Sequence, residues 1–308
     1  MASNFSIGHT SRGDTGVTVI YCGPQGALAS VDVRGGGPGT RETDLLAPHN
    51  TVERVHAIVL AGGSAFGLAA AHGVMEELEK EGIGFAVFGE GRPGPRVPIG
   101  PAAVSFDLAV GPSRPSAADG AAALRAALAG DDSSTGNVGA GCGATAGKLR
   151  GGFGISTQAA GEYTVAAAVV ANPVGGVVDP ASGRLFGAPA LPAVDPQRYA
   201  QVPDPKDAKL NTTIGAIITD APITKAQAKR LALTGHDGIA RAIRPAHSPL
   251  DGDTLFALST APAPGQVDPL TLAGLCAAAA DAVEAAIVDA VVSARPGYGL
   301  TDYSSLLR

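Results

Sequence analysis

Apolar residues in this chain gather in short runs that end at glycine or proline, a pattern typical of strands and helices joined by tight turns. In the first third, residues 15–22 and 27–33 predict two strands joined by a Gly-Pro-Gln-Gly turn, and residues 56–60 predict a third strand. Apolar residues then recur at helical spacing from Ser64, the expected N-cap, to Gly82, where the predicted helix ends.

The later part of the chain changes several times between helical and extended patterns. A second helix is predicted over residues 117–128, and a glycine-dense loop follows between residues 136 and 154. Residues 189–205 contain five prolines and few apolar neighbours, which indicates a loop or linker. The remaining predicted elements are a strand over 163–171, a hairpin over 177–185, a buried strand over 212–219, a helix from the capping box at Thr224 to about 243, a strand over 255–260 and a C-terminal helix within 272–294.

The order of these elements favours a layered α+β domain over a doubly wound sheet, because strands and helices do not alternate strictly. With 308 residues, of which 45% are hydrophobic and 16% charged, the chain suits one domain over residues 1–308, whose core needs neither disulfides nor a metal. The 43 glycines, 23 prolines and absence of tryptophan indicate many tight turns around a core of small aliphatic side chains.

Charge and cysteine usage exclude several classes of function. The net charge of −6, without any cluster of Lys or Arg, argues against nucleic-acid and anionic-membrane partners. Cys22, Cys142 and Cys276 are far apart and form no CxxC motif, which indicates reduced thiols in a cytosolic protein and no zinc site. The first 14 residues lack the apolar core of a signal peptide, and acidic residues interrupt the apolar stretch 272–294. We therefore expect a cytoplasmic location.

Residues 136–148 (GNVGAGCGATAGK) raise the question of phosphate binding. They fail the spacing of a P-loop, because Cys142 stands where the first glycine is needed and Leu149 replaces the Ser or Thr after Lys148. A dinucleotide site is also disfavoured, since no clear strand precedes the loop and no ribose-binding acid follows at the expected distance. By itself this segment predicts a close-packed turn, no cofactor, and an ordinary surface lysine at position 148.

Two short motifs are each open to a structural and a chemical interpretation. Asn172 precedes a proline at the end of a strand, so it either starts a turn or supplies a side-chain amide to an oxyanion. Asp251 and Asp253 flank a glycine in turn chemistry before a strand. If that segment is extended, both carboxylates lie on one face, where they can orient an amine and relay a proton. Taken alone, each motif favours the structural interpretation.

The junction between Asn211 and Thr212 stands out by position, because a proline-rich loop meets a buried strand there. If the chain were cut at this bond, Thr212 would carry a hydroxyl and a free α-amine. Such an amine has an ordinary pKa of about 7.7–8.0, so it can act as the base for its own hydroxyl. An ordinary strand start is the simpler interpretation of the residues alone.

Together these segments resemble one family. The runs AIVLAGGSAFGLAAAHGVMEEL, GAGCGATAGKLRGGFG, VVANPVGGVVD, NTTIGAIITDAPIT and SPLDGDTLFALST occur in the order seen in the nylon-oligomer (6-aminohexanoate) endohydrolases, a branch of the DmpA-type L-aminopeptidase/D-esterases. The resemblance covers about residues 10–295. Its most specific parts are the NTTI junction and the DGDTLFA run.

The resemblance implies a self-processing N-terminal-nucleophile hydrolase with a four-layer αββα sandwich, assembled as a homotetramer. It implies cleavage between Asn211 and Thr212 into residues 1–211 and 212–308, with Thr212 as the nucleophile. The substrate would be a small peptide or oligoamide, and no cofactor or metal would be needed.

The family's other functional residues match positions found above. Lys148 would polarise or position the nucleophile, Asn172 would bind the oxyanion, and Asp251 with Asp253 would orient the nucleophile and its amine. Phe66 is a departure, since it stands where other members carry a tyrosine that helps bind substrate or the oxyanion. Because phenylalanine has no donor, reduced activity on the family's usual substrates is expected.

Three alternatives belong to other classes of function. A self-released threonine also serves amino-acid N-acyltransferases, which would transfer an acetyl group instead of hydrolysing an amide. An uncleaved relative could keep the fold and only bind small molecules, with Phe66 as a sign of lost catalysis. A nucleotide-binding oxidoreductase is the least favoured of the three.

Overall fold

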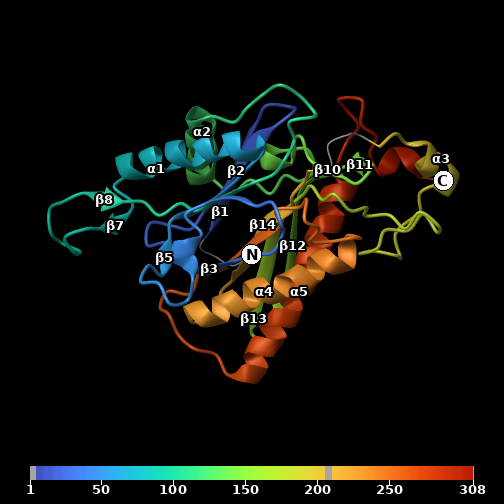
Figure 1. Cartoon of the computed structure of the whole chain (residues 1–308). Coiled ribbons are helices and arrows are strands. Elements are labelled where there is room, and N and C mark those ends of the chain that lie inside the picture. The colour runs from blue at the N-terminus through green and yellow to red at the C-terminus, as the bar shows by residue number, and fades with distance from the viewer. Residues whose placement is uncertain (1–4, 205–209, 308) are drawn as a thin grey trace.

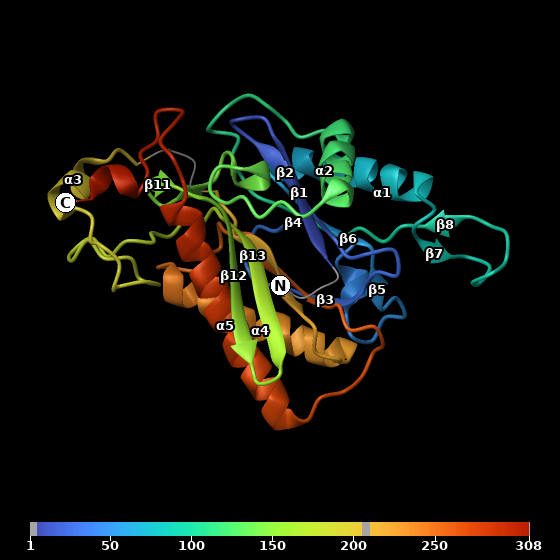
Figure 2. The same cartoon turned by 180° about the vertical axis from the view of Figure 1, so that it is seen from behind.

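The computed structural model describes residues 5–204 and 210–307, whose elements form four layers: two β-sheets between two pairs of helices (Figure 1, Figure 2). Helices α1 (Ala70–Lys80) and α2 (Ala117–Ala129) pack on the outer face of one sheet. Helices α4 (Lys225–Ala242) and α5 (Pro269–Val292) pack on the outer face of the other. This αββα order confirms the predicted fold class.

The first sheet has five strands and the second has six, and both mix parallel with antiparallel pairs. The strand order of the first sheet is β1 (Ser6–Ser11), β2 (Gly16–Tyr21), β6 (Ala57–Ala61), β9 (Ala102–Val104), β4 (Gly39–Arg41). The strand order of the second sheet is β12 (Gly152–Ala160), β13 (Tyr163–Ala171), β14 (Ile214–Thr219), β15 (Thr254–Ser259), β3 (Ala27–Val33), β5 (Arg54–Val55). The smaller elements are the pairs β7 (Phe85–Ala86) with β8 (Arg96–Val97) and β10 (Thr145–Ala146) with β11 (Leu149–Arg150), the short α3 (Pro196–Gln201), and the 3-10 turns η1 (Asp44–Leu46), η2 (Ser64–Ala69), η3 (Gly139–Gly141), η4 (Ser304–Leu306).

Three apolar clusters account for the four layers, one in each space between adjacent layers. Strand β14 shows how one sequence serves two of them. Ile214 and Ile218 point into the space between the sheets, whereas Ile217 points toward α4 and α5. Because successive side chains of a strand point to opposite faces, a strand buried on both sides needs an apolar run without alternation. The run predicted over 212–219 meets this requirement.

Several elements confirm the pattern-based predictions closely. Strands β3 and β13 span the predicted residues, and a bridge between Val178 and Leu185 closes the predicted hairpin. The Thr224 capping box is present, with α4 ending before Ile243, and α2 ends at Gly130. Helix α5 covers the predicted stretch 272–294 up to Val292, and no helix in residues 5–204 and 210–307 is long and apolar enough to cross a membrane.

Other predictions were wrong, each for a local reason. Ser64 is not an N-cap: its φ is +52° and it begins the turn η2, so α1 starts only at Ala70. The proline-rich loop contains α3, whose N-terminus is capped by Asp195. The glycine-dense loop already includes β10, β11 and the start of β12 at Gly152. Strand β1 was missed because its residues are mostly polar or small.

The topology of the second sheet brings distant residues to one edge. Strands β14 and β15 are parallel, so the segments that precede them, residues 211–213 and 251–253, enter the sheet side by side. Strand β13 is antiparallel to β14, so its end at Ala171 lies next to the start of β14. Asn172, Thr212 and the two aspartates therefore meet at the same edge.

Candidate active site

Thr212 lies at this edge, almost fully enclosed, with only 4% of its surface exposed. Its backbone N–H donates to the carbonyl of Asn172 at 2.7 Å, and the N–H of Asn211 donates to that of Leu250 at 3.3 Å. The Thr212 hydroxyl donates to the carbonyl oxygen of Asn211, the residue before it. In the intact chain, the hydroxyl is thus held directly against the peptide group that would be cut.

Gly252 allows this close packing. A Cβ atom at Gly252 would lie 2.9 Å from Thr212 Oγ1 and 2.7 Å from the carbonyl oxygen of Gly37. Its lack of a side chain is required here by space and not by an unusual φ. The glycine in the Asp-Gly-Asp motif therefore makes room for the hydroxyl, and the aspartates on either side turn away from it.

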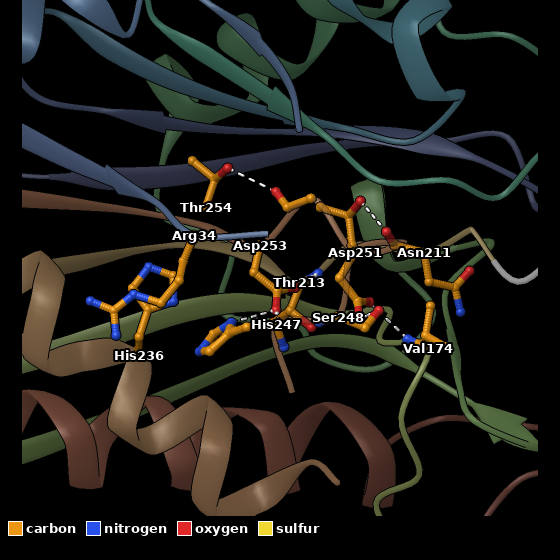
Figure 3. A network of polar contacts seen from close by, with 12 residues as sticks. Arg34, Val174, Asn211, Thr213, His236, His247, Ser248, Asp251, Asp253 and Thr254 are labelled. Atoms are coloured by element: carbon orange, nitrogen blue, oxygen red, sulfur yellow. Dashed lines mark hydrogen bonds and ion pairs between the residues drawn. The ribbon is translucent and has the colours of Figure 1, made fainter. Parts of the chain in front are cut away.

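Asp251 and Asp253 bind backbone N–H groups near Thr212, at Val174 and Thr213 (Figure 3). Asp251 accepts the N–H of Val174 at 3.0 Å through one oxygen, and the hydroxyl of Ser248 at 2.6 Å through the other. Asp253 accepts the N–H of Thr213 at 2.8 Å. Burial raises the pKa of Asp251 and the nearby Asp253 carboxylate adds to this, while its hydrogen bonds oppose the shift.

Ser248 and His247 complete this network and were not found in the sequence. The Nδ1 atom of His247 lies 2.7 Å from Asp253 Oδ2, and the backbone N–H of His247 donates to the same oxygen at 3.2 Å. The only available signal was proximity, since both residues precede the Asp-Gly-Asp motif by a few positions. A lone His-Ser pair in a loop carries too little pattern to be singled out.

Asn172 is fully buried and joins three parts of the site. Its side-chain oxygen accepts the N–H of Thr145 at 2.8 Å, and its amide nitrogen donates to the carbonyl of Phe106 at 2.9 Å. Its second amide hydrogen has no hydrogen-bond partner within residues 5–204 and 210–307. Asn172 is therefore rigidly held beside Thr212, with one donor left over.

Lys148 is not brought into contact with Thr212. It forms the turn between β10 and β11, where its ammonium lies 3.5 Å from the carbonyl of Ala200 and 5.9 Å from the centre of the Tyr199 ring. Both partners belong to α3, in the part of the chain that precedes Asn211. In the uncut chain, Lys148 therefore lies against α3 and away from Thr212.

A cavity of about 250 Å³ opens beside Thr212. No ionisable side chain is among its lining residues, which are Gly37, Pro38, Gly39, Ser64, Ala65, Val104, Phe106, Leu210, Asn211, Thr212 and Leu250. Phe66 is absent from this lining: it is 62% exposed and its ring lies 5.3 Å from the guanidinium of Arg114. The cavity suits an uncharged group next to the hydroxyl.

Behind the cavity, Asp107 supports the glycine turn at residues 62–64. Its Oδ1 accepts the N–H of Gly63 at 2.7 Å, whereas its Oδ2 and the hydroxyl of Thr15 both face Gly62 without forming a hydrogen bond. Burial raises the pKa of Asp107 to about 6. This buried carboxylate was not predicted, because a single aspartate in a loop has no distinguishing pattern.

The described residues contain no group of three or more His, Cys, Asp or Glu side chains placed to hold a metal ion. The groups that the structure gathers at this site are a buried hydroxyl, an adjacent carbonyl, an amide donor and fixed carboxylates. Such a set is suited to acyl transfer through a threonine ester.

Comparison with known proteins points in the same direction. Residues 3–303 match the model of peptidase family S58. An uncharacterized aminopeptidase of Mycobacterium tuberculosis is 45% identical, with 94% of this chain and 89% of that protein covered. A 6-aminohexanoate-oligomer endohydrolase of Paenarthrobacter ureafaciens is 35% identical over 83% of this chain and 72% of that protein.

Solved structures share the fold over nearly the whole length. A β-aminopeptidase of a Burkholderia species superposes with a TM-score of 0.75 at 25% identity, covering 99% of this chain and 90% of that one. The L-aminopeptidase D-Ala-esterase/amidase of Ochrobactrum anthropi, described as a variant of the Ntn hydrolase fold, has a TM-score of 0.75 at 20% identity, covering 98% and 89%. The second likeness concerns the fold alone.

Proposed function

This chain belongs to peptidase family S58, and we propose that it cuts its own backbone between Asn211 and Thr212 to release Thr212 as an N-terminal nucleophile. As a member of this family it is a hydrolase of peptide or amide bonds. The observation that carries the proposal is the hydrogen bond from the buried Thr212 hydroxyl to the Asn211 carbonyl, beside a cavity whose lining has no ionisable side chain. The mature enzyme would consist of residues 1–211 and 212–308.

Self-cleavage proceeds by an N→O acyl shift. Thr212 Oγ1 attacks the carbonyl carbon of Asn211, the C–N bond breaks, and the hydroxyl proton ends on the nitrogen, which becomes the α-amine of Thr212. Water then hydrolyses the ester, leaving a carboxylate on Asn211 and restoring the hydroxyl. Asp253 assists by fixing the N–H of Thr213 next to the reacting bond, and Asp251 assists by fixing the neighbouring backbone at Val174 and Ser248.

In turnover, the free α-amine of Thr212 takes the proton from its own hydroxyl, which attacks a substrate amide. The unpaired amide hydrogen of Asn172 and backbone N–H groups stabilise the oxyanion. The α-ammonium returns the proton to the leaving amine, and water releases the acyl group. Lys148 approaches only after the segment that contains Ala200 has been displaced, and then supplies positive charge at the rim.

The substrate is a small peptide or oligoamide whose acyl part is uncharged, since the cavity beside Thr212 offers no ionisable partner. The names of the relatives, which include an aminopeptidase and a 6-aminohexanoate-oligomer endohydrolase, agree with this class. We further propose a homotetramer. Phe85, Phe88 and Val97 are exposed on the projecting β7–β8 hairpin and supply an apolar contact surface (Figure 1).

The test is the intact mass of freshly purified protein, followed over days at neutral pH. We expect two fragments, 1–211 and 212–308, and an amidase activity that appears as they form. Thr212→Ala should remain one inactive chain. Thr213→Val is the matched control, because the neighbouring Thr213 hydroxyl is buried without a partner, so its loss should leave cleavage unchanged.

The outcomes separate the alternatives. A cut chain in Thr212→Ala would refute Thr212 as the nucleophile. Transfer of acetyl groups between amino acids, without net hydrolysis, would indicate an N-acyltransferase. A wild-type chain that stays whole and hydrolyses no amide or peptide would indicate a binding protein that kept the fold.

A further inference from the structure

The loop before β15 contains His247, which is hydrogen-bonded to the carboxylate of Asp253. The same carboxylate accepts the backbone N–H of Thr213, the residue after Thr212. His247 has a left-handed backbone, with φ of +55°, and this lets both its N–H and its ring approach Asp253 Oδ2. The other oxygen of Asp253 accepts the Thr213 N–H at 2.8 Å. One carboxylate therefore links the imidazole to the backbone of the nucleophile's neighbour, as Figure 3 shows.

Apart from Asp253, none of the described residues around His247 forms a hydrogen bond with its ring. The ring packs edge-on against His236 of α4, with centroids 4.8 Å apart. His247 Nε2 and His236 Nδ1 are buried and have no partner among the described residues. His236 Nε2 faces Asp32, which is itself paired with Lys229 and Arg34. Burial, followed by the neighbouring His247, lowers the pKa of His236 to about 4, so it is neutral at neutral pH.

These contacts define how the ring bonds to Asp253. A carboxylate only accepts hydrogen bonds, so Nδ1 of His247 must carry the proton that faces it. The bond is then charge-assisted and stronger than one between neutral groups. The position of Asp253 Oδ2 is further fixed because the backbone N–H of His247 donates to this oxygen as well.

We propose that His247 is a positioning residue for the reaction at Thr212: its Nδ1–H fixes the Asp253 carboxylate, which in turn fixes the Thr213 N–H and the approach of the Thr212 hydroxyl to the Asn211 carbonyl. His247 does not exchange a proton with the reacting atoms. Its effect arises because a misplacement of a reacting group by about 1 Å can cost on the order of 100-fold in rate. This role rests on the proposed self-cleavage.

The test compares three variants that all suit a positive φ. His247→Gly removes the side chain, His247→Asn places an amide N–H where Nδ1–H was, and His247→Asp has the shape of Asn but no donor when ionised. We expect the first-order rate of self-cleavage to fall about 10- to 100-fold in His247→Gly and His247→Asp. His247→Asn should recover most of the rate, and added imidazole should partly restore His247→Gly.

Melting temperatures and an exposed-histidine control, His72→Asn, are measured alongside. A purely structural role would make the rates follow the melting temperatures, with no rescue by Asn or imidazole, and would overturn the proposal. So would equal rates in wild type and all three variants. If the wild type hydrolyses amides without cutting itself, the proposed self-cleavage fails, and the same comparison of variants on amide hydrolysis still decides the role of His247.

Discussion

Two segments that contribute residues to the lining of the cavity at Thr212 differ in how they pair their buried carboxylates. The wall of residues 247–253, named here the acidic wall, pairs every oxygen of Asp251 and Asp253 with at least one backbone N–H. The wall of residues 62–66 and 104–107, named here the glycine wall, contains Asp107, of which Oδ1 is paired and Oδ2 has no hydrogen-bond partner among the described residues. All three residues are aspartates, but Asp251 and Asp253 accept hydrogen bonds on both carboxylate oxygens, whereas Asp107 accepts on one.

This difference separates a rigid support from a group that titrates. A buried carboxylate with donors on both oxygens is held in one geometry, and removing an acceptor leaves a backbone donor unsatisfied. A half-paired carboxylate destabilises the folded chain once it is ionised, because burial is only partly offset. The acidic wall therefore fixes the backbone beside Thr212, while the glycine wall makes the stability of the folded chain depend on pH.

The largest expected effect comes from removing one acceptor in the acidic wall. In Asp251→Asn or Asp253→Asn, the new NH2 group must face a backbone N–H whichever way the amide is turned. We expect each variant to lose about 1–3 kcal/mol of unfolding free energy and to cut itself at least about tenfold more slowly. Denaturant titration and intact mass measure the two effects.

Asp237→Asn, on the exposed side of α4, is the control for this pair. It should change neither quantity. If both acidic-wall variants cut themselves at the wild-type rate, self-cleavage does not need every carboxylate oxygen of Asp251 and Asp253 to be hydrogen-bonded. The difference in hydrogen bonding between the two walls would then have no bearing on function.

An effect of opposite sign on unfolding free energy is expected in the glycine wall. The pKa of Asp107 in the folded chain, about 6, lies above its ordinary value of 3.8, so its stabilising contribution is present below pH 4 and is lost as the pH rises through 6. Asp107→Asn keeps the acceptor for Gly63 and removes the charge. It should therefore raise unfolding free energy at pH 8 by on the order of 2 kcal/mol.

The measurement is thermal unfolding of Thr212→Ala backgrounds, which stay in one piece, at pH values from 4 to 8. The gain from Asp107→Asn should grow between pH 4 and 6 and then level off. A gain that is the same at every pH, or a loss at pH 8, would contradict a carboxylate with a raised pKa at this position.

The smallest effect concerns Phe66, at the outer end of the glycine wall. The family resemblance predicts that a tyrosine here would add a donor for substrate or oxyanion. In this chain the ring is exposed and rests against Arg114, outside the lining of the cavity. Phe66→Tyr should therefore change amide hydrolysis by less than about twofold. A rise of tenfold or more in kcat/KM would place the ring in the working site.

Sequence patterns predicted those elements whose periodicity is strong and local. Strand β3, strand β13 and the capped helix α4 lie close to their predicted bounds, because an uninterrupted apolar run or a capping box depends only on near neighbours. Strands β1 and β12 were not recognised, since polar, small and glycine residues form strands there only through pairing with β2 and β13.

The candidate site shows the same division. The Asn211–Thr212 junction and the Asp-Gly-Asp motif were visible in the sequence, and the structure places them side by side. Neither Asp107 nor His247 carried a signal, and Lys148 and Phe66 matched a family motif but stand away from Thr212 in the intact chain. The contacts from Gly63 to Asp107 and from Lys148 to Ala200 join residues 44 and 52 positions apart, so they leave no trace in local spacing, and His247 lies in a loop without a regular pattern.

By itself, the sequence determined the αββα layering, the membership of a hydrolase family and the bond at which cleavage is proposed. The layered α+β class follows from apolar periodicity, whereas the αββα order, the family and the bond are what the resemblance of contiguous motifs implies; both kinds of signal act over short stretches of chain. The tertiary structure alone decided which carboxylate is fully paired, which is left half-paired, and which histidine holds Asp253. These depend on the parallel pairing of β14 with β15 and on burial, because desolvation and hydrogen bonding are properties of the folded surroundings.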